Sequence, residues 1–430
     1  MIQTRLLKNL WFAYAVALTV WGVNAYVELG RIYKDNELLA ATVNNRPRVS
    51  DFAVFYNAAK LAHVNFYERK IDVYSPSEQE QSLRTITAPV VAEKPLLAIY
   101  PPYFFGMVMP LSAVPAGTAW MIWCTLGAIS LLLTLYFITK SDQFKSPFVR
   151  YFAFLGVLCC YPAWLSFRLG QVSLFLPAAI AAFWYLLIAR RYLLAGIVSG
   201  FCMLKVQYLP MLAVVGLIMG RAKYLGGLLI AMVALFGLSI YTLGWDNILS
   251  FPGAVHYNET SANAGGVSPE MMQNFRGMLT VILGGETPDI RMAALAIFVV
   301  LCVSITELWW RMRKHGLTEK KLLKGAAVTT LIMLIASPHT HTQDYLAAAP
   351  AAIWLWQATA NDDRASSLYI RRTIAAFPAL SWVFFLLQPV FLFLRIQPYF
   401  IWATALVVMT LTVLDDTTLT LESIQQRQAV

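Results

Sequence analysis

Residues 192 to 219 read YLLAGIVSGFCMLKVQYLPMLAVVGLIM, an apolar stretch in which Lys205 is the only charged residue. Basic residues stand at both ends of it, at positions 190 and 191 and again at 221 and 223. Short loops rich in Lys and Arg stay on the cytoplasmic side of a membrane, so both ends are expected on that side. The stretch is therefore predicted to form a helical hairpin within a membrane, with its apex near residues 205 to 210.

The composition of the whole chain also places it in a bilayer. Of its 430 residues, 59% are hydrophobic and 13% are charged. A soluble globule of this composition could not cover its surface with polar groups. Apolar stretches long enough to cross about 30 Å of hydrocarbon recur along the sequence. The predicted spans are 9–29, 117–139, 150–168, 172–189, 223–243, 291–310, 325–337, 345–358, 373–394 and 398–414.

The fold class predicted from this pattern is an all-α polytopic membrane protein, with one integral membrane domain over residues 1–430. Residues 97–114 and the hairpin do not fit one simple crossing each, so about 10–13 transmembrane or re-entrant helices are expected. Adjacent prolines in Ile-Tyr-Pro-Pro-Tyr fix φ and bias Tyr100 away from a helix. The stretch 97–114 is therefore predicted to be shallow or re-entrant.

Lys and Arg predict the orientation of the chain. If the N-terminus is cytoplasmic, most basic loop residues fall on the same side, and the opposite short loops carry almost none. Two long polar segments, 30–96 and 244–290, then lie outside, and the tail 415–430 lies inside. The expected location is the inner (plasma) membrane, multi-pass, with an extracytoplasmic active site. The net charge of +10 is explained by basic residues in the predicted cytoplasmic loops, which orient the chain in the membrane and contact anionic lipid. Nucleic acid is therefore not expected as a partner.

The cysteines indicate neither a disulfide nor a metal site. Cys124, Cys159, Cys160, Cys202 and Cys302 all lie within apolar segments and lack metal-ligand spacing. They are expected to be small buried hydrophobic residues. The chain also lacks an HExxH motif and a nucleotide-binding fingerprint. The sequence therefore predicts no metal and no cofactor.

The first candidate site residue is Asp51, which follows the first predicted span in the long outer segment. Apolar residues recur at helical spacing after it, to about Asn65. Ser50 or Asp51 can cap this helix, and the helix dipole would hold a carboxylate there. Capping is the plainer interpretation of Asp51 and a catalytic role is the second; the two can coexist.

Lys205 is the second candidate, because an ionisable residue within a membrane segment indicates a functional site by default. An ammonium group binds phosphate as a point charge, so a lipid phosphate is the ligand expected first. Snorkelling of the side chain to the interface is the alternative. Arg168 and Gln171 place a basic residue and an amide in an outer turn close to the membrane surface.

Two further polar groups are expected near the outer surface. The segment Ser-Pro-His-Thr-His-Thr-Gln-Asp-Tyr carries His339, His341 and Asp344. Their spacing does not suit zinc, and hydrogen bonding to phosphate or sugar suits them better. In the second outer segment, Asn274 and Arg276 can meet another anionic or sugar group, although an ordinary solvated loop is the more common case.

In their order along the chain, these residues resemble glycosyltransferase family 87, a GT-C superfamily group of polyprenyl-phosphate-sugar-dependent transferases. The similarity runs from about residue 50 to residue 350. It rests on the order of short motifs: Asp51-Phe52 with Tyr56, Asp72-Val73-Tyr74, Tyr100-Pro101-Pro102, Gly170-Gln171, Lys205, Asn274 with Gly277, and Ser337-Pro338. The chain departs from similar sequences at Val206, where proline is usual, and at Gln343-Asp344, where paired histidines occur.

The resemblance implies a GT-C-like fold with short helices in the first extracytoplasmic loop. It implies a hexosyltransferase with a polyprenyl-phosphate sugar as donor, mannose being favoured, and an envelope glycolipid or glycan as acceptor. The expected partners are therefore membrane lipids, this donor and this acceptor. The family's acidic base falls on Asp51, which would take the acceptor proton. Lys205, with Arg168 or Arg276, would bind the donor phosphate, and Tyr100 belongs to the same expected site.

Two other classes of function remain as alternatives. A lipid or solute transporter would work without catalytic chemistry, but it should show repeat symmetry and broken helices in matched positions. The sequence shows one such hairpin. A scaffold subunit of an envelope-polymer assembly would predict that Asp51 is dispensable. The long outer loops and Asp51 favour the enzyme.

Overall fold

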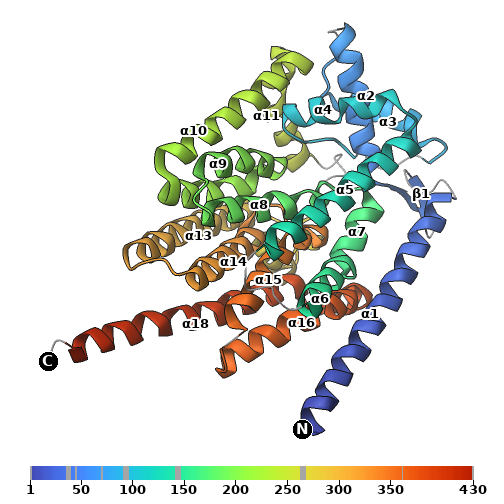
Figure 1. Ribbon diagram of the computed structural model, residues 1–430. Coiled ribbons are helices and arrows are strands. Elements are labelled where there is room, and N and C mark those ends of the chain that lie inside the picture. The colour runs from blue at the N-terminus through green and yellow to red at the C-terminus, as the bar shows by residue number, and fades with distance from the viewer. Residues whose placement is uncertain are drawn as a thin grey trace.

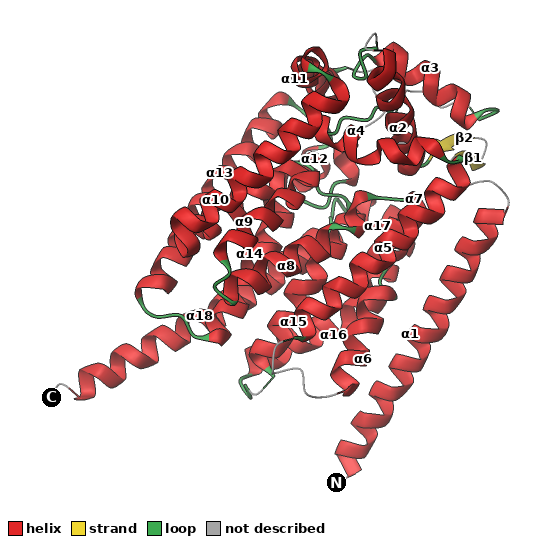
Figure 2. Cartoon of the chain, turned by 45° about the horizontal axis from the view of Figure 1, so that its top comes forward, coloured by secondary structure: helices red, strands yellow, loops and turns green. Residues whose placement is uncertain are grey.

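The computed structural model describes residues 2–34, 40–43, 46–68, 71–90, 96–140, 147–261, 268–360 and 362–428. Helices make up most of this part of the chain, and many of the long ones share one direction (Figures 1 and 2). The α-helices of the first half are α1 (Ile2–Lys34), α2 (Asp51–Glu68), α3 (Pro76–Thr87), α4 (Pro102–Val108), α5 (Ala116–Thr139), α6 (Pro147–Leu158), α7 (Tyr161–Leu169), α8 (Leu176–Ile188) and α9 (Tyr192–Phe201). In the second half they are α10 (Leu209–Leu243), α11 (Trp245–Thr260), α12 (Phe275–Leu283), α13 (Pro288–Lys314), α14 (Glu319–Ala336), α15 (Ala348–Thr359), α16 (Ala365–Leu386), α17 (Gln388–Phe393) and α18 (Pro398–Gln428).

Short 3₁₀ helices join several of these elements. They are η1 (Met109–Ala113), η2 (Val172–Leu174), η3 (Cys202–Tyr208), η4 (Pro269–Met271) and η5 (Thr342–Ala347). A two-stranded antiparallel hairpin, β1 (Ala40–Val43) with β2 (Arg46–Val49), follows α1. This β-hairpin was not predictable from sequence, because two four-residue strands carry too little periodicity to be recognised.

The predicted helical membrane architecture is confirmed. Three helical runs have the length and apolar composition to cross a membrane: Ala116–Thr139, Tyr192–Leu243 and Pro288–Lys314. Two shorter apolar runs, Val172–Ile188 and Pro398–Leu414, accompany them. Parts of the predicted outer segments 30–96 and 244–290 lie outside the described residues, and these parts are 35–39, 44–45, 69–70, 91–95 and 262–267.

The hairpin predicted at 192–219 is present. Its two ends meet, since a Cβ added to Gly220 would lie 2.7 Å from the Cβ of Tyr192. Helix α9 forms one arm, the first part of α10 forms the other, and η3 forms the apex. The chain then turns at Arg221, which has φ of 48° and ψ of −131°, and α10 continues as a further pass. Gly196 and Gly227 allow this pass to approach α9 closely, as small residues do between membrane helices.

The predicted span 150–168 is divided into two helices, α6 and α7. Proline at the second position of α7 cannot continue the hydrogen-bond ladder of a preceding helix. Side chains of α16 satisfy the freed backbone groups: the N–H of Tyr161 donates to Ser381 Oγ at 2.9 Å, and Trp382 donates to the carbonyl of Cys159 at 2.7 Å. The protein supplies these partners because the bilayer core contains no water to do so.

Buried tryptophans connect the central helices. The rings of Trp184 in α8 and Trp309 in α13 stack with centroids 5.3 Å apart. Each indole N–H donates to a threonine of α14, Trp184 to Thr330 at 3.0 Å and Trp309 to Thr329 at 2.9 Å. Three helices are therefore fixed to one another without an unsatisfied buried N–H.

The first long polar segment, which was predicted to lie outside, folds into helices that cover one end of the bundle, as Figure 1 shows for α2, α3 and α4. Helix α2 is almost wholly buried from Phe52 to Ala62. Its Tyr56 hydroxyl donates to the carbonyl of Val114 at 2.8 Å, and Asn65 donates to the carbonyl of Leu243 at 2.9 Å. The expectation of short helices here is met, and they hold the start of α2 firmly against the membrane helices.

Candidate active site at the breaks between helices

Four candidate residues from distant parts of the chain come together where helices begin or break. Asp51 begins α2, Gln171 precedes η2, Lys205 lies in η3 and Asp344 lies in η5. Segment η5 packs against α7, α8 and η2, which brings the breaks to one end of the bundle. A continuous helix would direct these side chains along its surface, whereas the breaks leave them free to face one another.

The Asp51 carboxylate faces this site. Ser50 caps α2, because its Oγ accepts a hydrogen bond from the N–H of Ala53 at 3.2 Å. Asp51 instead accepts a hydrogen bond from the Gln171 side chain and lies within electrostatic reach of Lys205. Burial raises the pKa of Asp51 to about 6, and both neighbours oppose the rise. Of the two residues predicted to cap the helix, Ser50 does so, and the Asp51 carboxylate contacts Gln171 instead.

Gly170 sets the approach of Asp51 to Gln171. It ends α7 in the left-handed conformation with φ of +64°, and a Cβ added there would lie 2.6 Å from the Cβ of Phe52. Phe52 directly follows Asp51, and Gly170 directly precedes Gln171. The backbone neighbours of the two site residues are therefore in contact, which only glycine permits at this position.

Gly170→Ala is expected to lower both the melting temperature and the activity. The left-handed conformation costs a residue with a Cβ about 1–2 kcal/mol, and the clash with Phe52 pushes Asp51 away from Gln171. Gly237→Ala is the matched control, since it has no atom within 4 Å and should leave both quantities unchanged or raise stability. Equal melting temperatures and activities in the two variants would show that this contact does not position the site.

Lys205 and Asp344 form a buried ion pair. The Lys205 ammonium lies 2.7 Å from the Asp344 carboxylate, and the two side chains are 11% and 0% exposed. Asp344 also accepts hydrogen bonds from the Ser173 hydroxyl and from the backbone N–H of His341. Snorkelling therefore does not account for Lys205, because an acid holds its ammonium group inside the protein. Ser173 was missed by the sequence analysis, since a serine beside an apolar run carries no distinguishing signal.

Tyr100 lies beside both carboxylates. Its hydroxyl is within electrostatic reach of Asp51 and Asp344. The ring stacks on Phe104 with centroids 4.3 Å apart and meets Phe55 edge-on at 5.2 Å. These aromatic neighbours fix the ring, so the Pro-Pro bend after Tyr100 places a phenol at the site.

A second charged cluster surrounds Arg276, whose side chain is only 4% exposed. Its guanidinium lies 2.8 Å from Glu259 and 2.5 Å from Glu286. His339 lies 2.6 Å from Glu259 and 3.3 Å from Arg276. Burial raises the pKa of Glu259, but His339 and Arg276 outweigh it and lower the pKa to about 2. Both glutamates were missed from sequence, although they lie in the predicted second outer segment.

Three of the remaining candidates have different surroundings. Asn274 is fully buried, accepts a hydrogen bond from the N–H of Gly277 at 2.8 Å and donates to the carbonyl of Ser337 at 2.7 Å. As the cap of α12 it organises the backbone, and its predicted contact with a ligand stays a prediction. Arg168 is half-buried in the last turn of α7. His341, also half-buried, lies between the two clusters, and burial lowers its pKa to about 4.

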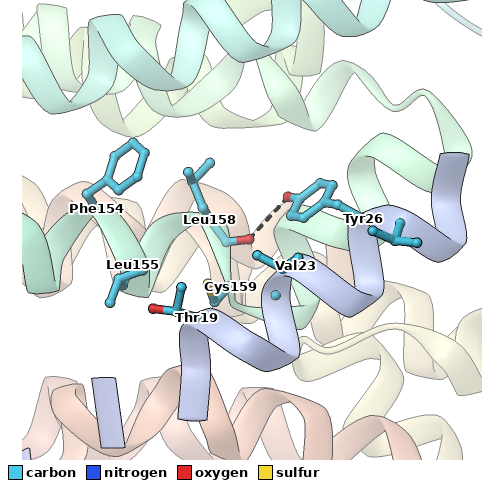
Figure 3. Close-up of a pocket in the computed structure, with 9 residues that line it drawn as sticks. Thr19, Val23, Tyr26, Phe154, Leu155, Leu158 and Cys159 are labelled. Atoms are coloured by element: carbon cyan, nitrogen blue, oxygen red, sulfur yellow. Dashed lines mark hydrogen bonds between the residues drawn. The ribbon is translucent and has the colours of Figure 1, made fainter. Parts of the chain in front are cut away.

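An open apolar groove of about 450 Å³ lies between α1 and α6. Figure 3 shows Val23 and Tyr26 of α1 facing Leu155 and Leu158 of α6, with the Tyr26 hydroxyl donating to the carbonyl of Leu158 at 3.1 Å. Helix α6 is followed by α7, which ends two residues before Gln171. None of the candidate site residues lines this groove.

The arrangement suits proton transfer beside an anion. It combines a carboxylate of raised pKa, an ammonium group held in place by a second carboxylate, and a phenol. Among the residues that the structure describes, no three His, Cys, Asp or Glu side chains group closely enough to bind a metal ion. Independence of metals and cofactors stays a prediction.

The model of one protein family, described as glycosyltransferase family 87, matches residues 98–338, more than half of the chain. The match includes Tyr100, Gln171 and Lys205, and it leaves out Asp51 and Asp344. A relative from Mycobacterium tuberculosis (strain CDC 1551 / Oshkosh) is 25% identical over 273 residues. It is named a polyprenol-phosphate-mannose-dependent alpha-(1-2)-phosphatidylinositol pentamannoside mannosyltransferase. That similarity covers 61% of this chain and 58% of the relative, and no solved structure matches the chain.

Proposed function

Since the chain belongs to glycosyltransferase family 87, we propose that it transfers mannose from a polyprenyl-phosphate donor to an envelope glycolipid or glycan. The mycobacterial relative supports the donor, because its name states dependence on polyprenol-phosphate mannose. The observation that carries the proposal is the position of Asp51, a base of raised pKa, within electrostatic reach of the Lys205 ammonium.

Asp51 is the proposed catalytic base. The acceptor hydroxyl oxygen forms a bond to the anomeric carbon of the donor sugar while its proton passes to the Asp51 carboxylate. The bond between the anomeric carbon and the phosphate oxygen breaks, and polyprenyl phosphate leaves with the electron pair. A base with a pKa of about 6 suits this step, because it is ionised at neutral pH and holds a proton better than an ordinary aspartate.

Lys205 is the cation that we assign to the donor phosphate. Its ammonium has three N–H donors, and Asp344 does not occupy all of them, so a phosphate oxygen can accept another. A cation at this oxygen stabilises the charge that develops as the phosphate leaves. Arg276 is a poorer candidate than the sequence analysis expected, because Glu259 and Glu286 already neutralise it. Gln171 and the half-buried His339 and His341 are the proposed contacts to the sugar.

The proposed position of the lipid tail is the open apolar groove between α1 and α6. Its walls are apolar side chains such as Leu155 and Leu158, which suit a prenyl chain. The tail would run along α7, about 14 Å long for its nine residues, before the phosphate reaches the site. Donor and protein would then meet within the bilayer, and no soluble nucleotide sugar is required.

The proposed location is the inner membrane, with the site on the extracytoplasmic side and the N-terminus in the cytoplasm. The arrangement of basic residues supports this orientation. Helix α14 begins among Lys320, Lys321 and Lys324 and ends beside the site segment at Ser337. Its eighteen residues span about 27 Å, close to the hydrocarbon thickness, so the lysines and the site lie near opposite membrane surfaces.

The test is transfer by the purified full-length protein in nanodiscs. The protein is supplied with labelled polyprenyl-phosphate mannose, glucose or arabinose and with an envelope-lipid extract. We expect labelled glycolipid and released polyprenyl phosphate, with mannose as the best donor. Another preferred polyprenyl-phosphate sugar would correct the sugar alone. Turnover with none of these donors, but with a nucleotide sugar, would refute the proposed donor class.

A further inference from the structure

The backbone of Gln273 is bonded at two points to the segment that carries Asp344. Gln273 lies in the second long polar segment, between η4 and α12. Its N–H donates to the carbonyl of Thr340 at 2.7 Å, and its carbonyl accepts a hydrogen bond from the Tyr345 hydroxyl at 2.7 Å. Thr340 precedes Asp344 in the sequence and Tyr345 follows it. One residue of the second polar segment therefore holds both sides of the turn around Asp344.

The contact with Thr340 leads directly to the Asp344 carboxylate. The carbonyl of Thr340 and the N–H of His341 belong to one peptide group. The carbonyl accepts from Gln273, and the N–H donates to the Asp344 carboxylate at 3.0 Å. Hydrogen bonds in series polarise one another, so the first strengthens the second. Gln273 therefore supports the Asp344 carboxylate through a single peptide group.

The contact with Tyr345 limits the movement of Asp344 on its other side. Tyr345 directly follows Asp344 and is 1% exposed. Its hydroxyl is bonded to Gln273, and its ring lies against that of Tyr399, with centroids 5.2 Å apart. A fixed side chain also fixes the backbone that carries it, and Asp344 shares that backbone.

Gln273 is itself anchored to the start of α18. It is 4% exposed. Its side-chain amide donates to the side chain of Gln397 and accepts from the backbone N–H of Tyr399 at 3.2 Å. Gln397 in turn donates to the carbonyl of Glu270 at 2.7 Å. Both the backbone and the side chain of Gln273 are therefore bonded within the protein, so it is a rigid support for the site segment.

The segment 337–345 is also tied to the hairpin apex. Gln207, two residues after Lys205, donates to the carbonyl of His339 at 3.1 Å. The ion pair of Lys205 with Asp344 is a second tie, at 2.7 Å. The segment thus lies between the hairpin apex and Gln273. Release of the Gln273 contacts would leave Asp344 free to shift relative to Lys205.

We propose that the second long polar segment positions the Lys205–Asp344 ion pair, through the hydrogen bond from the Tyr345 hydroxyl to the Gln273 carbonyl. The inference rests on the proposed function, in which Lys205 binds the donor phosphate. Tyr345 is a positioning residue, because it acts on the phosphate only through the neighbouring ion pair. The second polar segment then takes part in recognition of the donor.

Tyr345→Phe tests this contact, and Tyr399→Phe is its matched control. Each variant removes one hydroxyl that donates to a backbone carbonyl, that of Gln273 in the first case and that of Ser381 in the second. The two tyrosines are 1% and 2% exposed, and both variants keep the contact between their rings. Similar losses in melting temperature are therefore expected. Only Tyr345→Phe should affect the site.

The full-length protein in nanodiscs is titrated with labelled polyprenyl phosphate and assayed for sugar transfer. Tyr345→Phe is expected to weaken binding of polyprenyl phosphate by about threefold to tenfold, the effect of one lost hydrogen bond. The KM for the donor should rise by a similar factor while kcat changes less, because Asp51 keeps its hydrogen bond from Gln171. Hydrogen exchange of residues 337–345 should become faster in Tyr345→Phe and not in Tyr399→Phe.

Equal binding of polyprenyl phosphate by wild type and Tyr345→Phe would overturn the proposal. Equal losses in the two tyrosine variants would also overturn it, since they would reflect stability alone. A wild-type protein that neither binds polyprenyl phosphate nor transfers sugar would instead refute the proposed function. Hydrogen exchange requires no ligand, so it would still test the contact: unchanged exchange of residues 337–345 in Tyr345→Phe would overturn the positioning as well.

Discussion

Asp51→Asn is expected to lower kcat for sugar transfer by a factor of about 10² to 10⁴, because an amide cannot take the acceptor proton. The substitution keeps the size of the side chain and an oxygen that can accept the hydrogen bond from Gln171. Ser50 continues to cap α2, so the fold should be retained. Melting temperature and donor binding are therefore expected to change little while turnover is lost.

The same base should determine the acid side of the pH profile. Below a pKa of about 6 the Asp51 carboxyl is protonated and cannot accept a proton, so the wild-type rate should rise with pH through about 6. The residual rate of Asp51→Asn should lack this rise. Asp363→Asn removes an exposed acid at the far end of the bundle and should keep both the rate and the profile. A wild-type profile that persists in Asp51→Asn would assign the titration to another group.

Asp344→Asn is expected to lower the free energy of unfolding by about 3–5 kcal/mol and to abolish transfer, because Lys205 then remains buried without its counter-charge. Asn keeps most of the shape of the side chain, so the loss measures charge rather than packing. Lys205→Met combined with Asp344→Leu removes both charges and should recover much of the stability. Transfer should stay absent in the double variant, because the donor phosphate has lost its cation.

The loss of stability is measured by unfolding in detergent, and the loss of sugar transfer is measured separately in nanodiscs. Glu80→Gln is the control for loss of an ion pair, since Glu80 pairs with Arg84 at an exposed position and should change stability by less than about 1 kcal/mol. A stable and active double variant would show that Lys205 and Asp344 serve the fold alone. The phosphate would then need another ligand, and Arg168 would be the next residue to substitute.

The membrane helices and the hairpin were predictable because both depend on local sequence. A bilayer demands apolar runs of a minimum length, and basic residues on each side of 192–219 predict that its ends meet. The helix after Asp51 was predictable from its periodicity and its capping residues. The break after Leu158 was missed, since apolar composition continues through it and the partners that stabilise it, Ser381 and Trp382, lie in α16.

The identity of the site residues was predictable only in part. Asp51, Gln171, Lys205, Asp344 and Tyr100 were selected as polar residues near membrane segments, and the structure brings them together. Their individual surroundings were not predictable. Asn274 was expected to meet a ligand, but its side chain caps a helix. Arg276 was expected to be available to an anionic or sugar group, but two glutamates already pair with it. Residue type and spacing do not show which neighbours a side chain already has.

Sequence alone determined that this protein is a membrane protein, where most of its apolar helices lie, and that a charge is at the apex of a hairpin. Tertiary structure decided which groups that charge meets, by placing Asp344, 139 residues away, against Lys205, and by placing Asp51 in hydrogen-bond contact with Gln171. Helix formation and membrane insertion follow from neighbouring residues and the solvent. An ion pair inside a protein depends instead on which helix breaks meet after packing, and the distance along the chain carries no information about that.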